Sequence, residues 1–212
     1  MRNILKDIHL IMLMNIFYLI FAMFVIFFLQ MIFPFFTEMF YFDPSVAITE
    51  PWRFFTSMFL HGGHMHLLFN MFALFLFGTI LERNVGKKEF FKIFVAGGII
   101  GSLIYYLTIV IGLAPAIPAL GASGGVFAIL GALAILTPNL TIFLFFIPMK
   151  MKNAAIVWIV LEFFGMFNTM SGIASAAHLG GLVFGLLYAK HLKKKVYEPE
   201  FYEPDYFEPS NF

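Results

Sequence analysis

The chain has 212 residues, of which 61% are hydrophobic and 12% are charged, and its formal net charge is +1. Soluble domains carry about twice that share of charged residues, so the composition indicates a membrane protein. The nearly neutral charge balance gives no indication of a nucleic-acid partner. Cysteine is absent, which excludes disulfides, thiolate metal sites and a cysteine nucleophile.

Six apolar stretches have lengths near the roughly 17–25 residues that a transmembrane helix requires. They cover about residues 9–33, 64–81, 90–111, 121–136, 153–167 and 173–191. The fifth is short and could begin before residue 153. No cleavage site of the Ala-x-Ala kind follows the first stretch, so we interpret it as a retained transmembrane helix.

Two further apolar segments are not interpreted as spans. LTIFLFFIPMKMK, between the fourth and fifth stretches, is cut short by Pro148, Lys150 and Lys152. It is therefore predicted to be strand-like or to lie at the membrane interface. The segment from Glu38 to His61 is rich in Phe, Trp and Pro, and it is also expected at the interface.

The positions of the positive residues predict the orientation of the chain. With a cytoplasmic N-terminus, all of the 13 Lys and Arg residues except Arg53 lie on the inner side. This asymmetry predicts that both termini are cytoplasmic, which requires an even number of spans. We therefore expect an all-α membrane protein with six transmembrane helices, N-in and C-in, within residues 1–195. Residues 196–212 repeat an aromatic-Glu-Pro pattern and predict a disordered cytoplasmic tail.

Polar side chains inside the predicted spans are scarce, which makes them functional candidates. His66 and Asn70, Ser123, and His178 belong to three different spans but lie at a similar depth near the external side. His66 and Asn70 are four residues apart, so they share one face of a helix. These four side chains are expected to form one polar cluster.

The expected cluster contains the groups that a serine hydrolase needs. His178 is the candidate base that takes the proton of Ser123, the candidate nucleophile. Asn70 and His66 are candidate hydrogen-bond donors to an oxyanion, and the backbone N–H of Ser123 is a further candidate.

The small residues near these positions allow two interpretations. Gly121 and Gly124 are expected to let the backbone approach the reacting group and to open an irregular helix start. Small residues also pack membrane helices, and the row Ala177-x3-Gly181-x3-Gly185 is typical of such packing. Polar residues in spans are often only hydrogen-bonded to a neighbouring carbonyl, so a purely structural cluster stays an alternative.

Five short motifs follow one another between about residues 50 and 190. They are Trp52-Arg53, MHLLFN at 65–70, Glu82-x3-Gly86, GASG at 121–124 and AHLGGLVFG at 177–185. With these motifs the sequence resembles the rhomboid family of intramembrane serine proteases. The resemblance implies a compact six-helix bundle with a water-filled cavity open to the outer side. It also implies cleavage of single-span transmembrane substrates near their outer ends, by a multi-pass protein expected in a cell membrane.

The resemblance further implies a Ser123–His178 dyad, supported by Gly121, Gly124 and Gly181, with no cofactor and no metal. No Asp or Glu is expected near His178. Glu162, the acid within the fifth span, is expected to be a structural partner rather than a third catalytic member. Phe127 stands where the family usually has a tyrosine. Its ring is expected to orient His178 by stacking, without the hydrogen bond of a phenol.

Two other functions stay open. One is a metal-binding transporter, in which the metal would be held by His61, His64, His66 and His178. No carboxylate joins these histidines. A rhomboid-like pseudoenzyme that acts as a chaperone or adaptor would use the same bundle, although such relatives generally lack the serine or the histidine. Sensitivity to a chelator would identify the first alternative, and failure to label Ser123 would favour the second.

Overall fold

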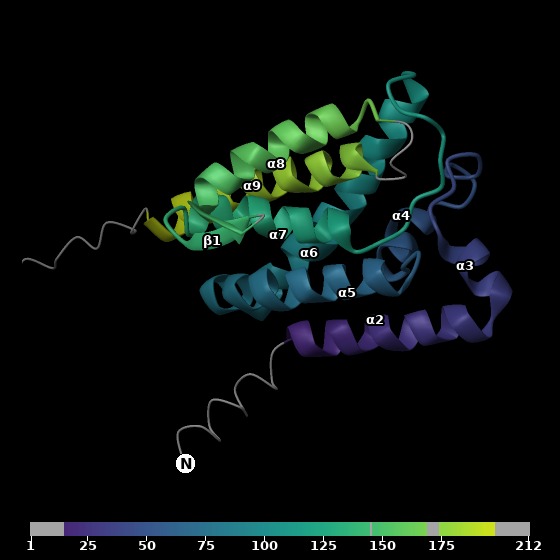
Figure 1. Cartoon of the computed structure of the whole chain (residues 1–212), viewed down its shortest axis with the longest axis horizontal. Coiled ribbons are helices and arrows are strands. Elements are labelled where there is room, and N and C mark those ends of the chain that lie inside the picture. Colours follow the sequence, from purple (N-terminus) through teal and green to yellow (C-terminus); the bar gives the residue numbers. More distant parts are fainter. Residues whose placement is uncertain (1–14, 145, 169–173, 198–212) are drawn as a thin grey trace, which may run out of the picture.

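The computed structural model describes residues 15–144, 146–168 and 174–197, and most of them are helical (Figure 1). In chain order the elements are α2 (Asn15–Ile32), α3 (Pro34–Phe40), α4 (Arg53–Thr56), the 3-10 turn η1 (Ser57–Phe59), α5 (His64–Ala73), the π-helical turn η2 (Leu74–Gly78), α6 (Thr79–Val110), α7 (Ser123–Leu136), β1 (Thr141–Leu144), β2 (Ile147–Lys150), α8 (Met151–Gly165) and α9 (Ser175–Tyr197). The short helices α3 and α4 lie between the first long helix, α2, and the rest of the bundle.

The long helices coincide with the predicted apolar stretches. The expected beginning of the first stretch, residues 9–14, lies outside the described residues, as do residues 169–173 and most of the predicted tail. α8 begins before residue 153, as its short apolar stretch suggested, but it also ends before residue 167. α9 continues to Tyr197, past the predicted end of the helical domain at residue 195.

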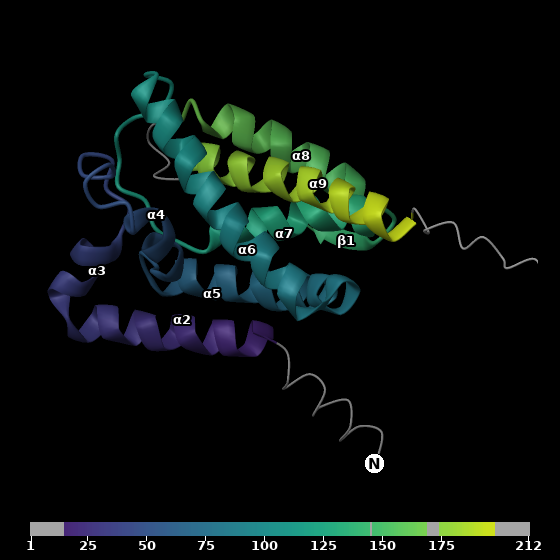
Figure 2. The same ribbon diagram turned by 180° about the vertical axis from the view of Figure 1, so that it is seen from behind.

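The second and third predicted spans form one helical run, His64–Val110, that turns at Gly86. Gly86 has φ 79° and ψ 167°, a left-handed conformation that glycine adopts without steric cost. Within the described residues, this run is the one helical stretch long and apolar enough to cross a membrane, and residues 16–32 and 123–136 form shorter apolar helices. The two parts of the run point in opposite directions (Figures 1 and 2).

Successive long helices alternate in direction along the bundle (Figure 1). The beginnings of α5, α7 and α9 therefore lie at one end, where α3 and α4 are also found. The beginning of α2 and the end of α9 lie toward the other end. This arrangement brings residues from the starts of three helices to a common level.

An antiparallel β-hairpin joins α7 to α8. Thr141 pairs with Lys150, and Leu144 pairs with Ile147. The side chains of Ile142 and Leu144 are buried, so one side of β1 packs against the bundle. The interpretation of this segment as strand-like is therefore confirmed.

α7 is the central helix of the bundle, because it packs against α5, α6, α8 and α9. Of the 13 residues that follow Ser123 in this helix, ten are buried. A Cβ atom at Gly181 of α9 would overlap the carbonyl oxygen of Gly124 on α7. Glycine is thus required where the two backbones cross, which agrees with the packing interpretation of the small-residue row.

The outer surface of the bundle is apolar. The exposed fractions of Phe21 on α2, Phe72 on α5 and Leu187 on α9 are 70%, 64% and 62%. Large apolar side chains exposed around several helices are typical of a surface that faces lipid rather than water.

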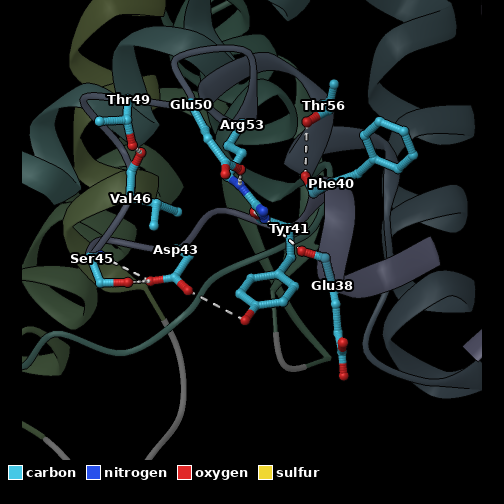
Figure 3. Close-up of polar contacts among 10 residues, drawn as sticks. All are labelled: Glu38, Phe40, Tyr41, Asp43, Ser45, Val46, Thr49, Glu50, Arg53 and Thr56. Atoms are coloured by element: carbon cyan, nitrogen blue, oxygen red, sulfur yellow. Dashed lines mark hydrogen bonds and ion pairs between the residues drawn. The ribbon is translucent and has the colours of Figure 1, made fainter. Parts of the chain in front are cut away.

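Arg53 holds together the loop between α3 and α4 (Figure 3). Its Nη1 donates hydrogen bonds to the carbonyl oxygens of Glu38 at 2.7 Å and Tyr41 at 2.8 Å, and its Nε donates to the Glu50 carboxylate. The guanidinium also lies 5.5 Å from the centre of the Tyr41 ring. Arg53 is only 8% exposed, so the loop is closed around a buried cation.

Asp43 organises the tip of the same loop (Figure 3). Its Oδ1 accepts hydrogen bonds from the backbone N–H of Ser45 at 2.9 Å and from the Ser45 hydroxyl at 2.6 Å. The hydrogen bond from the Ser45 side chain, followed by that from the backbone, holds the pKa of the Asp43 carboxyl below its usual range. Phe42 exchanges two backbone hydrogen bonds of 2.9 Å with Ala119, which ties the loop to the segment that leads into α7.

Replacing Arg53 is expected to destabilise the protein. Arg53→Ala removes the donor of two partly buried hydrogen bonds, to the carbonyls of Glu38 and Tyr41, which should cost about 1–3 kcal/mol of unfolding free energy. Arg53→Lys should recover only part of this, because an ammonium group cannot reproduce the fork of a guanidinium. The midpoint of thermal unfolding in detergent measures the effect. Arg83→Ala, at an exposed position near the turn at Gly86, is the control, and an equal loss in both variants would contradict the expectation.

Candidate active site

Ser123 and His178 meet at the starts of two adjacent helices. Ser123 is the first residue of α7, and His178 lies in the first turn of α9. The distance between His178 Nε2 and Ser123 Oγ is 2.7 Å, which is a hydrogen bond. The structure thus brings together the two side chains that were predicted to lie at one depth.

The backbone before Ser123 is shaped by Gly121. Its φ of 131° belongs to the region that glycine favours, and a Cβ atom there would lie 2.8 Å from His66 Nε2. The N–H of Gly121 donates to the carbonyl of Ser57 at 3.0 Å. The N–H of Ser123 belongs to the first turn of α7, where backbone N–H groups have no partner within the helix.

His66 and Asn70 lie on α5 and face the same site. His66 Nδ1 accepts the backbone N–H of Gly62 at 3.3 Å, so in the neutral ring the proton is on Nε2, toward Gly121. Asn70 Nδ2 donates one hydrogen to the carbonyl of His66 at 2.9 Å, which leaves its second N–H for another acceptor. His66 and Asn70 therefore each retain one side-chain N–H that can donate to another group.

A cavity of about 580 Å³ connects these groups. Its wall contains the polar side chains His66, Asn70, Ser123 and His178. Apolar residues from α5 to α8 make up much of the rest: Phe69, Phe77, Val126, Phe127, Leu130 and Trp158. An apolar cavity of this size with a few convergent polar groups is typical of a ligand or substrate site.

Phe127 stacks on the imidazole of His178. Their ring centroids are 4.4 Å apart and the planes differ by 9°. Trp158 of α8 packs edge-on against Phe127 from a centroid distance of 6.3 Å. The expectation that this ring stacks on His178 is therefore confirmed.

The expectation that no carboxylate lies near His178 is wrong. Glu162 Oε1 is 3.0 Å from His178 Nδ1. Because α8 ends at Gly165, Glu162 lies in its last turn and reaches the level of His178. The sequence contained a signal for this residue, since an acid within an apolar helix is costly unless it has a partner.

The histidines of the HGGHMH segment do not gather into a metal site. Within the described part of the chain, no group of three or more His, Asp or Glu side chains is placed to hold a metal ion. His64 packs edge-on against Phe27, with ring centroids 5.2 Å apart. His61 is buried and contacts the ring of His66 at 5.3 Å. This geometry gives the transporter alternative no support.

Comparison with known proteins agrees with the motifs. Residues 49–195 match the family model described as the Rhomboid domain. The chain is 36% identical over 148 residues to "Rhomboid protease GluP" of Bacillus subtilis, an alignment that covers 69% of this chain and 27% of that protein. It is 35% identical over 147 residues to "Rhomboid protein 1, mitochondrial" of Saccharomyces cerevisiae, covering 66% of this chain and 41% of the relative. The chain thus spans less than half the length of these two relatives. Since the family model matches more than half of the chain, the protein belongs to the rhomboid family, whose members are integral to membranes.

Proposed function

We propose that this protein is a multi-pass serine endopeptidase of a cell membrane that cleaves single-span transmembrane substrates near the outer side of the bilayer. The observation that carries the proposal is the 2.7 Å hydrogen bond between His178 Nε2 and Ser123 Oγ, in the wall of a cavity. A serine within hydrogen-bond reach of a histidine supplies an activated nucleophile and its base. The Bacillus subtilis relative is named a rhomboid protease, which supports the same chemistry.

In the proposed reaction, Ser123 Oγ attacks the carbonyl carbon of the substrate while its proton passes to His178 Nε2. The resulting tetrahedral intermediate carries a negative charge on the former carbonyl oxygen. Its collapse breaks the C–N bond, and the amine leaves with the proton from Nε2. Water then adds to the acyl carbon and gives a proton to Nε2. Release of the acid breaks the bond to Ser123 and returns that proton to Oγ.

The oxyanion would be stabilised by donors already present around the cavity. His66 Nε2–H, the second N–H of Asn70 and the backbone N–H of Ser123 are the three candidates. Donors fixed before the reaction need no reorganisation when the charge develops, which is why such groups lower the barrier effectively.

A cleavage assay tests the proposal. The wild type and Ser123→Ala are reconstituted in liposomes with a single-span substrate that has helix-breaking residues near its outer end. A peptide bond within a helix is engaged in backbone hydrogen bonds, so local unwinding should be required before attack. We expect cleavage by the wild type alone, and no loss of activity with EDTA or a thiol reagent. Loss on chelation with recovery on adding zinc would instead support a metal function.

We also propose six membrane spans with both termini in the cytoplasm. The distribution of Lys and Arg and the alternating directions of the long helices in Figure 1 support this. Reporter tags before Met1 and after Phe212 should both resist protease added outside intact cells. A tag within the loop between α3 and α4 should be cut in the same cells. Protection of one terminus and digestion of the other would contradict the topology.

A further inference from the structure

The ring of His178 is hydrogen-bonded at both nitrogens. Nε2 contacts Ser123 on α7 at 2.7 Å, and Nδ1 contacts the Glu162 carboxylate on α8 at 3.0 Å. The imidazole therefore lies between a hydroxyl and a carboxylate that come from two different helices. The resemblance to the rhomboid family implied a dyad, and the carboxylate is an addition to it.

We propose that Glu162 is a positioning residue that fixes the tautomer and the orientation of His178, so that Ser123, His178 and Glu162 act as a triad. This inference rests on the proposed proteolytic function. An ionised carboxylate can only accept hydrogen bonds, so Nδ1 must carry the proton when it faces Glu162. Nε2 is then left with a lone pair directed at the Ser123 hydroxyl, which is the form that a general base requires.

The carboxylate also has a role once the proton has moved. When His178 takes the proton of Ser123, the ring becomes an imidazolium with a hydrogen on each nitrogen. A negative charge 3.0 Å from Nδ1 stabilises that cation, while the proton on Nδ1 stays on the histidine. The side chains of His178 and Glu162 are only 12% and 15% exposed, so water screens this attraction weakly.

Neighbouring groups hold Glu162 and His178 in place. The buried hydroxyl of Ser175, at the start of α9, gives the Glu162 carboxylate a second hydrogen bond. Gly165 permits this close approach of α8 and α9, because a Cβ atom there would lie 2.5 Å from Ser175 Oγ. The stacked ring of Phe127 fixes the plane of the imidazole. Orientation of a catalytic group through such supporting contacts is typical of a pre-organised site.

A simpler role for Glu162 would be to tie α8 to α9 through a hydrogen bond, without any effect on chemistry. The chain offers a matched control for that role. Glu89 of α6 accepts a hydrogen bond from the hydroxyl of Tyr188 on α9 at 2.6 Å. Tyr188 lies about 15 Å along the helix from His178, so Glu89→Gln removes an interhelical carboxylate contact outside the site.

The test compares the wild type, Glu162→Gln, Glu89→Gln and Ser123→Ala in detergent on one single-span substrate. Glutamine keeps the size of the side chain but lacks the charge, and its amide can donate to Nδ1 and favour the wrong tautomer. We expect Glu162→Gln to lower kcat by about 10,000-fold with little change in KM, as loss of the triad carboxylate does in serine proteases. Glu89→Gln should keep kcat within about threefold, and Ser123→Ala should be inactive.

A second measurement reads the tautomer in the wild-type protein, and a variant serves only to assign the signals. With 15N-labelled histidine, the NMR signals that disappear in His178→Ala report which ring nitrogen carries the proton. The triad requires hydrogen on Nδ1 and none on Nε2. An Nε2–H tautomer in the wild type would overturn the inference, as would a kcat for Glu162→Gln within threefold of wild type. If Ser123→Ala is inactive in that case, the protease proposal still stands; if it is active, both fail.

Discussion

Ser123→Ala and His178→Ala are each expected to lower cleavage by up to about a millionfold, to the background of the assay. Without Ser123 Oγ no acyl-enzyme can form, and without His178 Nε2 the hydroxyl keeps its proton and stays a weak nucleophile. Because the two side chains act as one unit through a 2.7 Å hydrogen bond, the double variant should lose no more than either single variant.

Active-site labelling separates these losses from unfolding. A fluorophosphonate should label the wild type at Ser123 and should fail to label His178→Ala, although the hydroxyl is still present. His191→Ala is the matched control, since His191 is an exposed histidine of the same helix. It should be labelled and active like the wild type. Cleavage by Ser123→Ala at the wild-type rate would contradict the assignment of the nucleophile.

The positions of the long helices could be predicted because hydropathy alone determines them. A bilayer requires an apolar stretch of about 20 residues for each helical crossing, and Lys and Arg collect on one side. A strand-like segment between α7 and α8 could also be predicted, as one of two alternatives, since Pro148 and the lysines interrupt a stretch that is too short to cross. The pairing of two strands into a hairpin was not predicted. The common depth of Ser123 and His178 followed from their positions near corresponding ends of two predicted spans.

The contact between Glu162 and His178 could not be predicted from hydropathy. It depends on the end of α8, which the structure places at Gly165, and on the rotation of α8 about its own axis. An apolar composition all around a helix leaves that rotation undetermined. The rotation is set by packing details such as the close approach of Gly165 to Ser175, which involve residues on different helices. The sequence does not show which side chains of α8 face His178, so the expectation of a dyad without a carboxylate could not be checked before the structure was known.

His66→Ala and Asn70→Ala are each expected to lower the rate of cleavage by about 100- to 1,000-fold, or about 2.7–4 kcal/mol in the transition state. The effect should fall on kcat, because these donors act on the charge that develops during attack. The remaining donor and the N–H of Ser123 should preserve a measurable activity, unlike in Ser123→Ala. This partial loss distinguishes oxyanion stabilisation from nucleophilic catalysis.

Matched variants exclude a general disturbance of α5 and its neighbours as the cause of these losses. Asn84→Ala removes a 2.8 Å hydrogen bond to the carbonyl four residues earlier, the same local bond that Asn70 makes to His66, but at an exposed position. His64→Ala removes an imidazole of α5 that packs on Phe27 and does not line the cavity. Both controls should cleave at rates near that of the wild type. Full activity of His66→Ala and Asn70→Ala would contradict the assignment of these two donors. The group that stabilises the oxyanion would then be the backbone N–H of Ser123, because this donor at the start of α7 is present in both variants.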